Sequence, residues 1–186
     1  DLPLVSVSAV FQPGGPLDSS SKDAGLASLT ASMLDEGAGS LDALGFGEAV
    51  AALGGRFGAS TTREAVVANL TILSRNFGKG AGLLADAVRR PRHEAKDFDR
   101  VQRLALDDLA QSDNEPSIVA GRVASMTLFG AAHPYAWPTT GTPETVKGTS
   151  LERVKAAHAA LLRPDAVTLL VAGNLSAAES RAGLEK

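Results

Sequence analysis

The chain has 186 residues, of which 44% are hydrophobic and 21% charged, with a formal net charge of -3 at pH 7. These values are typical of one soluble folded domain with a sizeable core, and they exclude a disordered chain. One tryptophan, one tyrosine and no basic cluster argue against nucleic-acid binding, and no apolar run is long enough to span a bilayer. The absence of cysteine excludes disulfides and thiolate chemistry, and leaves the compartment open, including a bacterial periplasm.

The first residues predict a strand followed by a helix. Residues 2–11 alternate and predict a half-buried strand, closed by a QPGGP turn, with one face made by Val5, Val7, Ala9 and Phe11. Residues 25–37 (GLASLTASMLDEG) predict a helix that Ser20 or Ser21 caps and Gly37 ends. Because the chain starts at Asp1 and not at Met, we expect a leader, tag or upstream domain to have been removed or to lie outside it.

The middle of the chain predicts a hairpin between helices. Residues 41–55 predict a helix ended by two glycines, and residues 56–73 predict a hairpin whose second arm turns one face inward, made by Val66, Ala68, Leu70 and Ile72. Two amphipathic helices follow at residues 82–91 and 97–111, the second with a buried side made by Phe98, Val101 and Leu104 to Leu109.

The last third predicts more helices and a closing strand. A helix is expected from Pro116 to Gly130, a short one after Thr142, and a third that a capping box of Thr149 and Glu152 starts. Residues 166–174 (AVTLLVAGN) then predict a buried strand. We therefore expect an α+β fold, a mostly antiparallel sheet with helices packed on one face. Residues 1–175 would form one lobe, and residues 176–186 would start a helix or linker towards a missing C-terminal lobe.

Few residues offer independent chemistry. The three histidines, His93, His133 and His158, are too far apart in sequence for a two-histidine metal face, so we expect structural or surface roles for them. No G-x-S-x-G nucleophile elbow occurs. Glycines at positions 78, 80 and 82 follow a strand, as in phosphate-binding loops, but their spacing and the apparent hairpin before them disfavour nucleotide binding.

The order of motifs resembles a known family. A strand, GLASLTASMLDEG, a second helix ending in GG, GASTTRE, RRPRHEAKDFDRVQRLALDDL, HPYAWPTTGTPETV and AVTLLVAGN follow one another over nearly the whole chain. This set resembles the N-terminal lobe of peptidase family M16, which includes pitrilysin, insulinase and the mitochondrial processing peptidase.

The resemblance implies an emptied zinc site. Active members carry H-x-x-E-H on the first helix, where two histidines bind zinc and the glutamate activates water. Those positions align with Ser28, Ala31 and Ser32, and the further carboxylate ligand aligns with Asp107 or Asp108. One oxygen ligand cannot replace two imidazoles, so we expect neither bound zinc nor peptide hydrolysis from this chain.

The resemblance also implies partners. Gly58, Ala59, Ser60 and Thr61 align with the strand that receives substrate backbone, although the family's first residue there, asparagine, is replaced. The chain would be a non-catalytic lobe that supports an active, zinc-carrying M16 half or subunit, together with a C-terminal M16 lobe and a peptide substrate. Taken alone, it would expose an apolar interface and self-associate.

Two alternatives stay open at this point. The chain could be an active zinc peptidase with rearranged ligands, His133 with Asp107 or Asp108. It could also be a scaffold without a peptidase partner, like the inactive core subunits of respiratory complexes that share this fold. An H-x-x-E-H sequence in a neighbouring gene or fused segment would favour the partner role over the scaffold.

Overall fold

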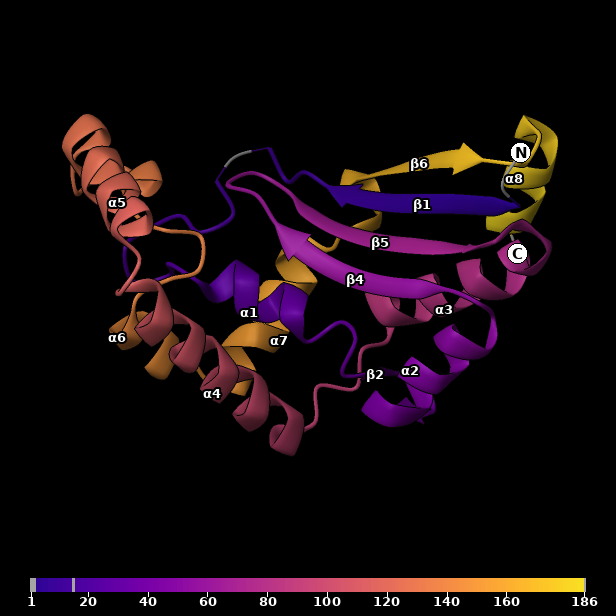
Figure 1. The fold of residues 1–186 in the computed structure, drawn as a ribbon, viewed down its shortest axis with the longest axis horizontal. Coiled ribbons are helices and arrows are strands. Elements are labelled where there is room, and N and C mark those ends of the chain that lie inside the picture. Colours follow the sequence, from indigo (N-terminus) through magenta and orange to yellow (C-terminus); the bar gives the residue numbers. More distant parts are fainter. Residues whose placement is uncertain (1–2, 15, 186) are drawn as a thin grey trace.

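The computed structural model describes residues 3–14 and 16–185 (Figure 1). Asp1, Leu2, Gly15 and Lys186, which the predicted strand, turn and terminal segments include, lie outside the described residues. The strands are β1 Leu4–Phe11, β2 Gly37–Ala38, β3 Leu41–Asp42, β4 Arg56–Thr61, β5 Val66–Leu73 and β6 Val167–Gly173. The helices are α1 Leu26–Ser32, α2 Ala43–Ala52, α3 Phe77–Arg89, α4 Ala95–Ser112, α5 Pro116–Phe129, α6 Pro143–Lys147, α7 Leu151–Leu161 and α8 Ala177–Leu184, with short 3-10 turns including η2 Pro134–Ala136.

Four strands form the main sheet, in the order β4-β5-β1-β6. Every neighbouring pair is antiparallel, so strands far apart in sequence meet in a regular register: Val7 of β1 lies opposite Leu70 of β5 and Val171 of β6. The predicted hairpin is the pair β4 and β5. The α+β class with a mostly antiparallel sheet is confirmed.

One face of the sheet is covered by helices, as predicted, and Figure 1 shows them gathered on that side. The predicted inward residues of β1 and β5 all belong to the main core, where they pack with Leu34, Phe46, Phe77 and Leu84. On the opposite face polar side chains of neighbouring strands pair instead: the hydroxyls of Ser6 and Thr71 lie 2.9 Å apart, and the Ser8 hydroxyl donates to Asn69 Oδ1 at 2.6 Å. The period of two in each strand therefore separates an apolar face from a polar one.

The closing strand differs from its prediction. Residues 166–174 were expected to form a buried strand, but most of β6 is exposed, so that expectation is wrong. Among the described strands, β6 pairs with β1 alone and is the last strand of the sheet. Leu169 and Leu170 are 45% and 56% exposed. An apolar run has no period that separates a central strand from an edge strand, and only the sheet order decides between them.

Three helix details also differ from the sequence reading. α1 ends at Ser32, before Gly37, and neither Ser20 nor Ser21 caps it. The N-cap of α7 is Ser150, whose hydroxyl accepts from the Arg153 N–H, whereas the predicted Thr149 is buried and donates to Thr145. On α4 the predicted buried side is narrower, because Leu104 is 50% exposed.

Helices α3 and α5 differ in how closely they pack on the sheet. Gly80 of α3 faces β5, and a Cβ there would lie 2.4 Å from Ile72 Cδ1, so close helix–sheet packing accounts for that glycine. Helix α5 forms as predicted but has no buried residue, and in Figure 1 it stands apart from the sheet. No described helix is both long and apolar enough to cross a membrane.

Candidate functional site

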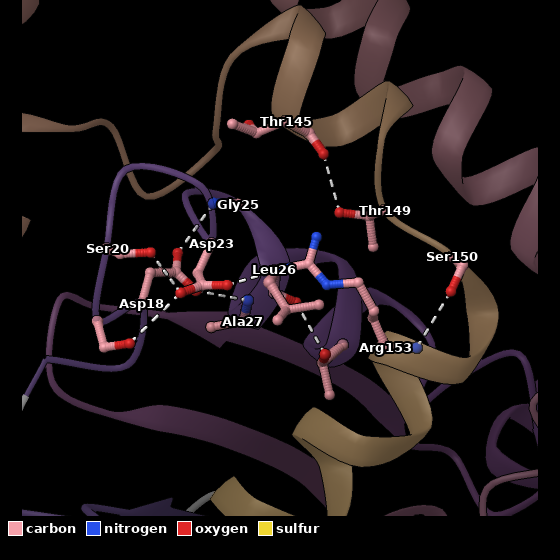
Figure 2. Close-up of polar contacts among 12 residues, drawn as sticks. Asp18, Ser20, Asp23, Gly25, Leu26, Ala27, Thr145, Thr149, Ser150 and Arg153 are labelled. Carbon is pink, nitrogen blue, oxygen red and sulfur yellow. Dashed lines mark hydrogen bonds and ion pairs between the residues drawn. The ribbon is translucent and has the colours of Figure 1, made fainter.

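The start of α1 is held by an aspartate from the preceding loop. The Asp18 carboxylate accepts hydrogen bonds from the backbone N–H groups of Gly25 at 2.9 Å and Ala27 at 3.0 Å (Figure 2). Burial raises the pKa of this carboxyl, and the two backbone bonds oppose the rise. Gly25 has φ 88°, and a Cβ there would lie 2.8 Å from Gly141 Cα, so the entry into α1 requires glycine.

A second set of polar contacts ties α1 to α7 (Figure 2). Arg153 of α7 pairs with Asp23 at 2.6 Å, and the Ser20 hydroxyl donates to the other Asp23 oxygen at 2.6 Å. Within α1 the Thr30 hydroxyl donates to the Leu26 carbonyl oxygen at 2.8 Å. Helix α1, which carries Ser28 and Ser32, is therefore held at its N-terminal side by Asp18 and by the Asp23–Arg153 pair.

A cavity of about 840 Å³ lies beside α1. Residues from α1, β4, α4 and α5 line it, and they include Ser28 and Ser32 of α1, Gly58 and Ala59 of β4, and Asp108 of α4. Its apolar wall comes from Leu29, Val101, Leu104, Leu109 and Ile118. The fold thus brings together positions as far apart in sequence as Ser28 and Thr140. The lining is apolar for the most part with a few polar groups, as is usual in ligand sites.

Carboxylates lie along one side of the cavity. Asp35 and Glu36 follow α1, and burial raises the pKa of both carboxyls while Arg100 opposes the rise. Glu36 is ion-paired with Arg100, which also lies 4.0 Å from Asp97. These contacts fix the end of α1 against α4 and make the lining polar at that point.

A paired arginine lines another part of the cavity. Arg122 of α5 bonds Asp113 at 2.5 Å and the Ser112 hydroxyl at 2.5 Å. Its charge is therefore partly satisfied by the end of α4. The same two contacts tie the middle of α5 to the end of α4, although the helix itself is exposed.

Several predicted site positions do not reach the cavity. Ala31 is 2% exposed and packs in the main core. Asp107, Ser60 and Thr61 are not among the cavity-lining residues. Neither is His133, whose Nδ1 accepts from the Tyr135 N–H at 3.1 Å and whose ring stacks on Phe129. The two members of the rearranged ligand set are thus not brought together in this cavity.

The donor set at the motif does not fit zinc. Ser28 and Ser32 offer neutral hydroxyls, position 31 offers a buried methyl group, and Asp108 offers one carboxylate. Protein zinc sites use three or four imidazole, thiolate or carboxylate ligands. Within residues 3–14 and 16–185 no group of three or more histidine, aspartate or glutamate side chains is arranged to hold a metal.

The β4 edge beside the cavity has unpaired backbone groups. The Thr62 N–H donates to the Ala65 carbonyl oxygen, which places Arg56, Gly58 and Ser60 in hydrogen-bonded pairs with β5 by antiparallel alternation. The N–H and C=O groups of Phe57, Ala59 and Thr61 then point away from the sheet. Within the predicted substrate stretch, Ala59 and Thr61 are the residues whose backbone an added strand can pair with.

Comparisons with known proteins agree with this geometry. The sequence model of the insulinase family, peptidase family M16, matches residues 5–136, and the chain belongs to this family. A Mycobacterium leprae protein described as an uncharacterized zinc protease is 26% identical over 161 residues, covering 87% of this chain and 36% of that protein. A Helicobacter pylori protein described as a non-peptidase homolog is 25% identical over 174 residues, covering 94% and 40%.

A solved structure gives the same architecture. The crystal structure described as the peptidase M16 inactive domain from Pseudomonas fluorescens superposes with a TM-score of 0.87 and 26% identity, covering 99% of this chain and 44% of that one. This chain therefore spans less than half the length of the relatives it matches. These relatives include proteins described as proteases and proteins described as inactive.

Sequence reasoning missed the residues that position the site. Asp18 lies seven residues before Gly25, outside the spacing of ordinary helix caps, so no local pattern indicates its role. Arg122 and Ile118 line the cavity because α5 begins next to it, with Arg122 bonded to Asp113 and Ser112 at the end of α4. Asp35 and Glu36 were visible as acidic residues after the helix, and their position beside the motif was the available signal.

Proposed function

We propose that this chain is a non-catalytic M16 lobe that holds an extended peptide and supports a zinc-carrying peptidase half. The observation that carries the proposal is the cavity itself. Ser28 and Ser32, the positions that we align with the family's metal motif, line it together with an apolar wall and residues of the β4 edge strand, and the described residues of its lining include no histidine to bind zinc.

The β4 edge supports peptide binding. A peptide added to β4 would form main-chain hydrogen bonds with Ala59 and Thr61, and alternate side chains would enter the cavity below. Main-chain hydrogen bonds do not depend on the peptide's sequence. The β4 edge would therefore supply affinity, and the residues that line the cavity would supply selectivity. Asp108 is the carboxylate that would correspond to the family's third ligand position, because it lines the cavity and Asp107 does not.

We place the C-terminal boundary of the lobe at residue 175 by the same family analogy. Residues 1–175 would form the lobe, and residues 176–186 would lead to a C-terminal lobe, a further domain consistent with the greater length of the relatives. Helix α8 starts this segment with a capping box between Ser176 and Glu179. It packs on α3, where Gly183 allows close contact with Phe77.

Peptide binding is the direct test. We expect fluorescein-labelled peptides of about ten residues to bind the chain with an anisotropy change, and Ala59→Pro to weaken binding about fivefold to tenfold. Proline removes the outward N–H of position 59 and is tolerated where the N–H faces away from the sheet. Leu169→Pro, the same change at the opposite edge, is the matched control and should leave the affinity unchanged.

The supporting role needs a second experiment. The polypeptide that carries H-x-x-E-H, encoded in a neighbouring gene or in a fused segment, is mixed with the chain, and peptide turnover is measured. A complex with raised turnover supports the proposal. If peptides bind but no complex forms and turnover is unchanged, the supporting role is wrong, and if peptides do not bind either, the scaffold role is favoured.

A further inference from the structure

Oxygen acceptors stand at the positions that we align with the family's zinc ligands. Ser28 and Ser32 carry hydroxyl groups on α1, Asp108 carries a carboxylate on α4, and all three residues line the cavity. Helix α1 packs against both β4 and α4, and Figure 1 shows it between them. These oxygens do not make a zinc site, but hydroxyl and carboxylate oxygens accept hydrogen bonds from a protonated amine or a guanidinium.

The negative charge of the lining is only partly neutralised. Asp35 and Asp108 line the cavity and take part in none of the ion pairs among the described residues. Glu36 shares Arg100 with the buried Asp97, whose Oδ2 has no hydrogen-bond partner in the described part of the chain. This side of the cavity therefore holds more carboxylates than its one arginine pairs with, which favours a positively charged ligand group.

The two arginines of the lining already have partners. Arg63 Nη1 donates to the Trp137 carbonyl oxygen at 3.0 Å, and the guanidinium carbon lies 5.2 Å from the centre of the Tyr135 ring. Arg122 is ion-paired with Asp113 at the end of α4. Both side chains are thus bonded to groups outside the lining, and the two unpaired carboxylates face the cavity without them.

The strand edge determines which peptide residue meets this lining. Ala59 of β4 lies opposite the buried Ala68 of β5, so its side chain is on the helix face of the sheet, while its N–H and C=O groups point outward. In a strand added antiparallel to β4, the residue opposite Ala59 bonds these groups and has its side chain on the same face. That side chain enters the cavity, which Ala59 itself lines.

We propose that the pocket lined by Ser28, Ser32 and Asp108 binds a basic side chain of the bound peptide, the one at the position opposite Ala59. The aliphatic stem of a lysine or arginine covers the apolar wall made by Leu29 and its neighbours, and the charged end reaches the oxygens. Asp108 determines the specificity, because it is the one charged member of this set. The inference rests on the proposed peptide-holding function and adds a class of peptide to it.

Peptides that differ at a single position test the pocket by fluorescence anisotropy. The host is about ten residues of alanine, serine and threonine, so that the one long side chain selects the register. We expect the lysine peptide to bind about fivefold to tenfold more tightly than the norleucine peptide, which keeps the aliphatic stem without the charge. The arginine peptide should share this preference, and a glutamate peptide should bind less tightly than the norleucine peptide.

Two neighbouring aspartates of α4 provide a matched pair of variants. In Asp108→Asn the preference for lysine over norleucine should fall to about twofold or less, because the charge inside the pocket is lost. Asp107→Asn removes the same charge one residue away, outside the lining, and should keep the preference. Circular dichroism confirms that both variants are folded. Ala59→Pro should weaken the lysine and norleucine peptides by the same factor.

The outcomes separate this inference from the proposed function. If peptides bind but lysine and norleucine are equivalent, or if Asp108→Asn keeps the preference, the basic pocket is wrong and peptide holding stands. A preference that Asp107→Asn and Asp108→Asn reduce alike also overturns the pocket, since it would reflect the general charge of α4. If none of the peptides binds, the peptide-holding function is wrong and the pocket with it.

Discussion

The two edges of the sheet have the same backbone chemistry and different surroundings. At β4 the outward groups belong to Phe57, Ala59 and Thr61, and at β6 they belong to odd-numbered residues from Val167 to Gly173. β4 lies beside α1 and lines the cavity with Gly58 and Ala59. β6 does not line the cavity; it packs on the core through Val167 and Val171 and exposes Leu169 and Leu170. Backbone pairing alone is therefore not selective, and the layer beneath each edge decides what kind of strand it accepts.

The largest expected effect is a gain of zinc on the β4 side. Ser28→His combined with Ser32→His places two imidazoles one helical turn apart beside Asp108, and we expect zinc content to rise from none to about one per chain. Elemental analysis after dialysis against metal-free buffer measures it.

The Ser28→His, Ser32→His double variant also tests which aspartate of α4 completes the zinc site. Adding Asp108→Asn should remove the bound zinc, whereas Asp107→Asn should not, because only Asp108 lines the cavity. Loss of zinc with Asp107→Asn alone would show that the α4 register in the site differs from the one described. Zinc in the unchanged chain would contradict the emptied-site reading.

The next effect compares a glycine at each edge. At Gly173, with φ 141°, a Cβ would lie 2.3 Å from Leu4 O and 2.6 Å from Val5 Cα, and backbone cannot move aside easily. Gly173→Ala should lower the free energy of unfolding by about 3 kcal/mol. At Gly58 a Cβ meets nothing within 4 Å, so Gly58→Ala should stay within about 0.5 kcal/mol. Urea denaturation measures both, and equal losses would mean that the two edges are equally crowded.

A smaller loss is expected when the support of α1 is removed. Asp18→Ala leaves the N–H groups of Gly25 and Ala27 without their acceptor, which should cost about 2 kcal/mol in thermal or urea unfolding. Peptide affinity at the β4 edge should fall with it. Ser20→Ala, which removes only a bond to Asp23, is the control, and an equal loss in that variant would show that Asp18 is not the main cap.

The last prediction concerns a buried histidine pair that belongs to neither edge strand. His93 is buried against His158 with ring centroids 5.2 Å apart, and burial, followed by His158 and Lys155, lowers its pKa to about 4. Burial also lowers the pKa of His158, whose Nε2 lies 2.8 Å from Val88 O. A base with a lowered folded-state pKa contributes stability above its unfolded pKa of 6.5 and loses it as pH falls towards 4.

We therefore expect stability to fall by about 2 kcal/mol through His93 between pH 7 and pH 4.5. His93→Asn removes the titration and keeps a residue that tolerates the positive φ of 49° at this position. Its unfolding free energy should depend less on pH over that range. An unchanged slope would assign the acid sensitivity to other groups.

Local patterns in the sequence determined most of the elements and the two faces of the sheet. The alternation in residues 4–11 and 66–73 and the turn residues between them are sufficient, because side-chain direction in a strand depends only on its own period. The spacing of Ser28, Ala31 and Ser32 and the missing histidines were likewise readable without a structure. The family follows from that order of residues.

Only the tertiary structure decided which residues meet and which strand is an edge. Asp18 reaches α1 from a loop, Asp108 enters the cavity while Asp107 does not, and Ala31 is core. VTLLVAG has the composition of a central strand, yet the sheet order leaves it open on one side. The order of the strands and the coverage of the sheet by helices depend on contacts between residues far apart in the chain. A local sequence pattern does not predict these contacts.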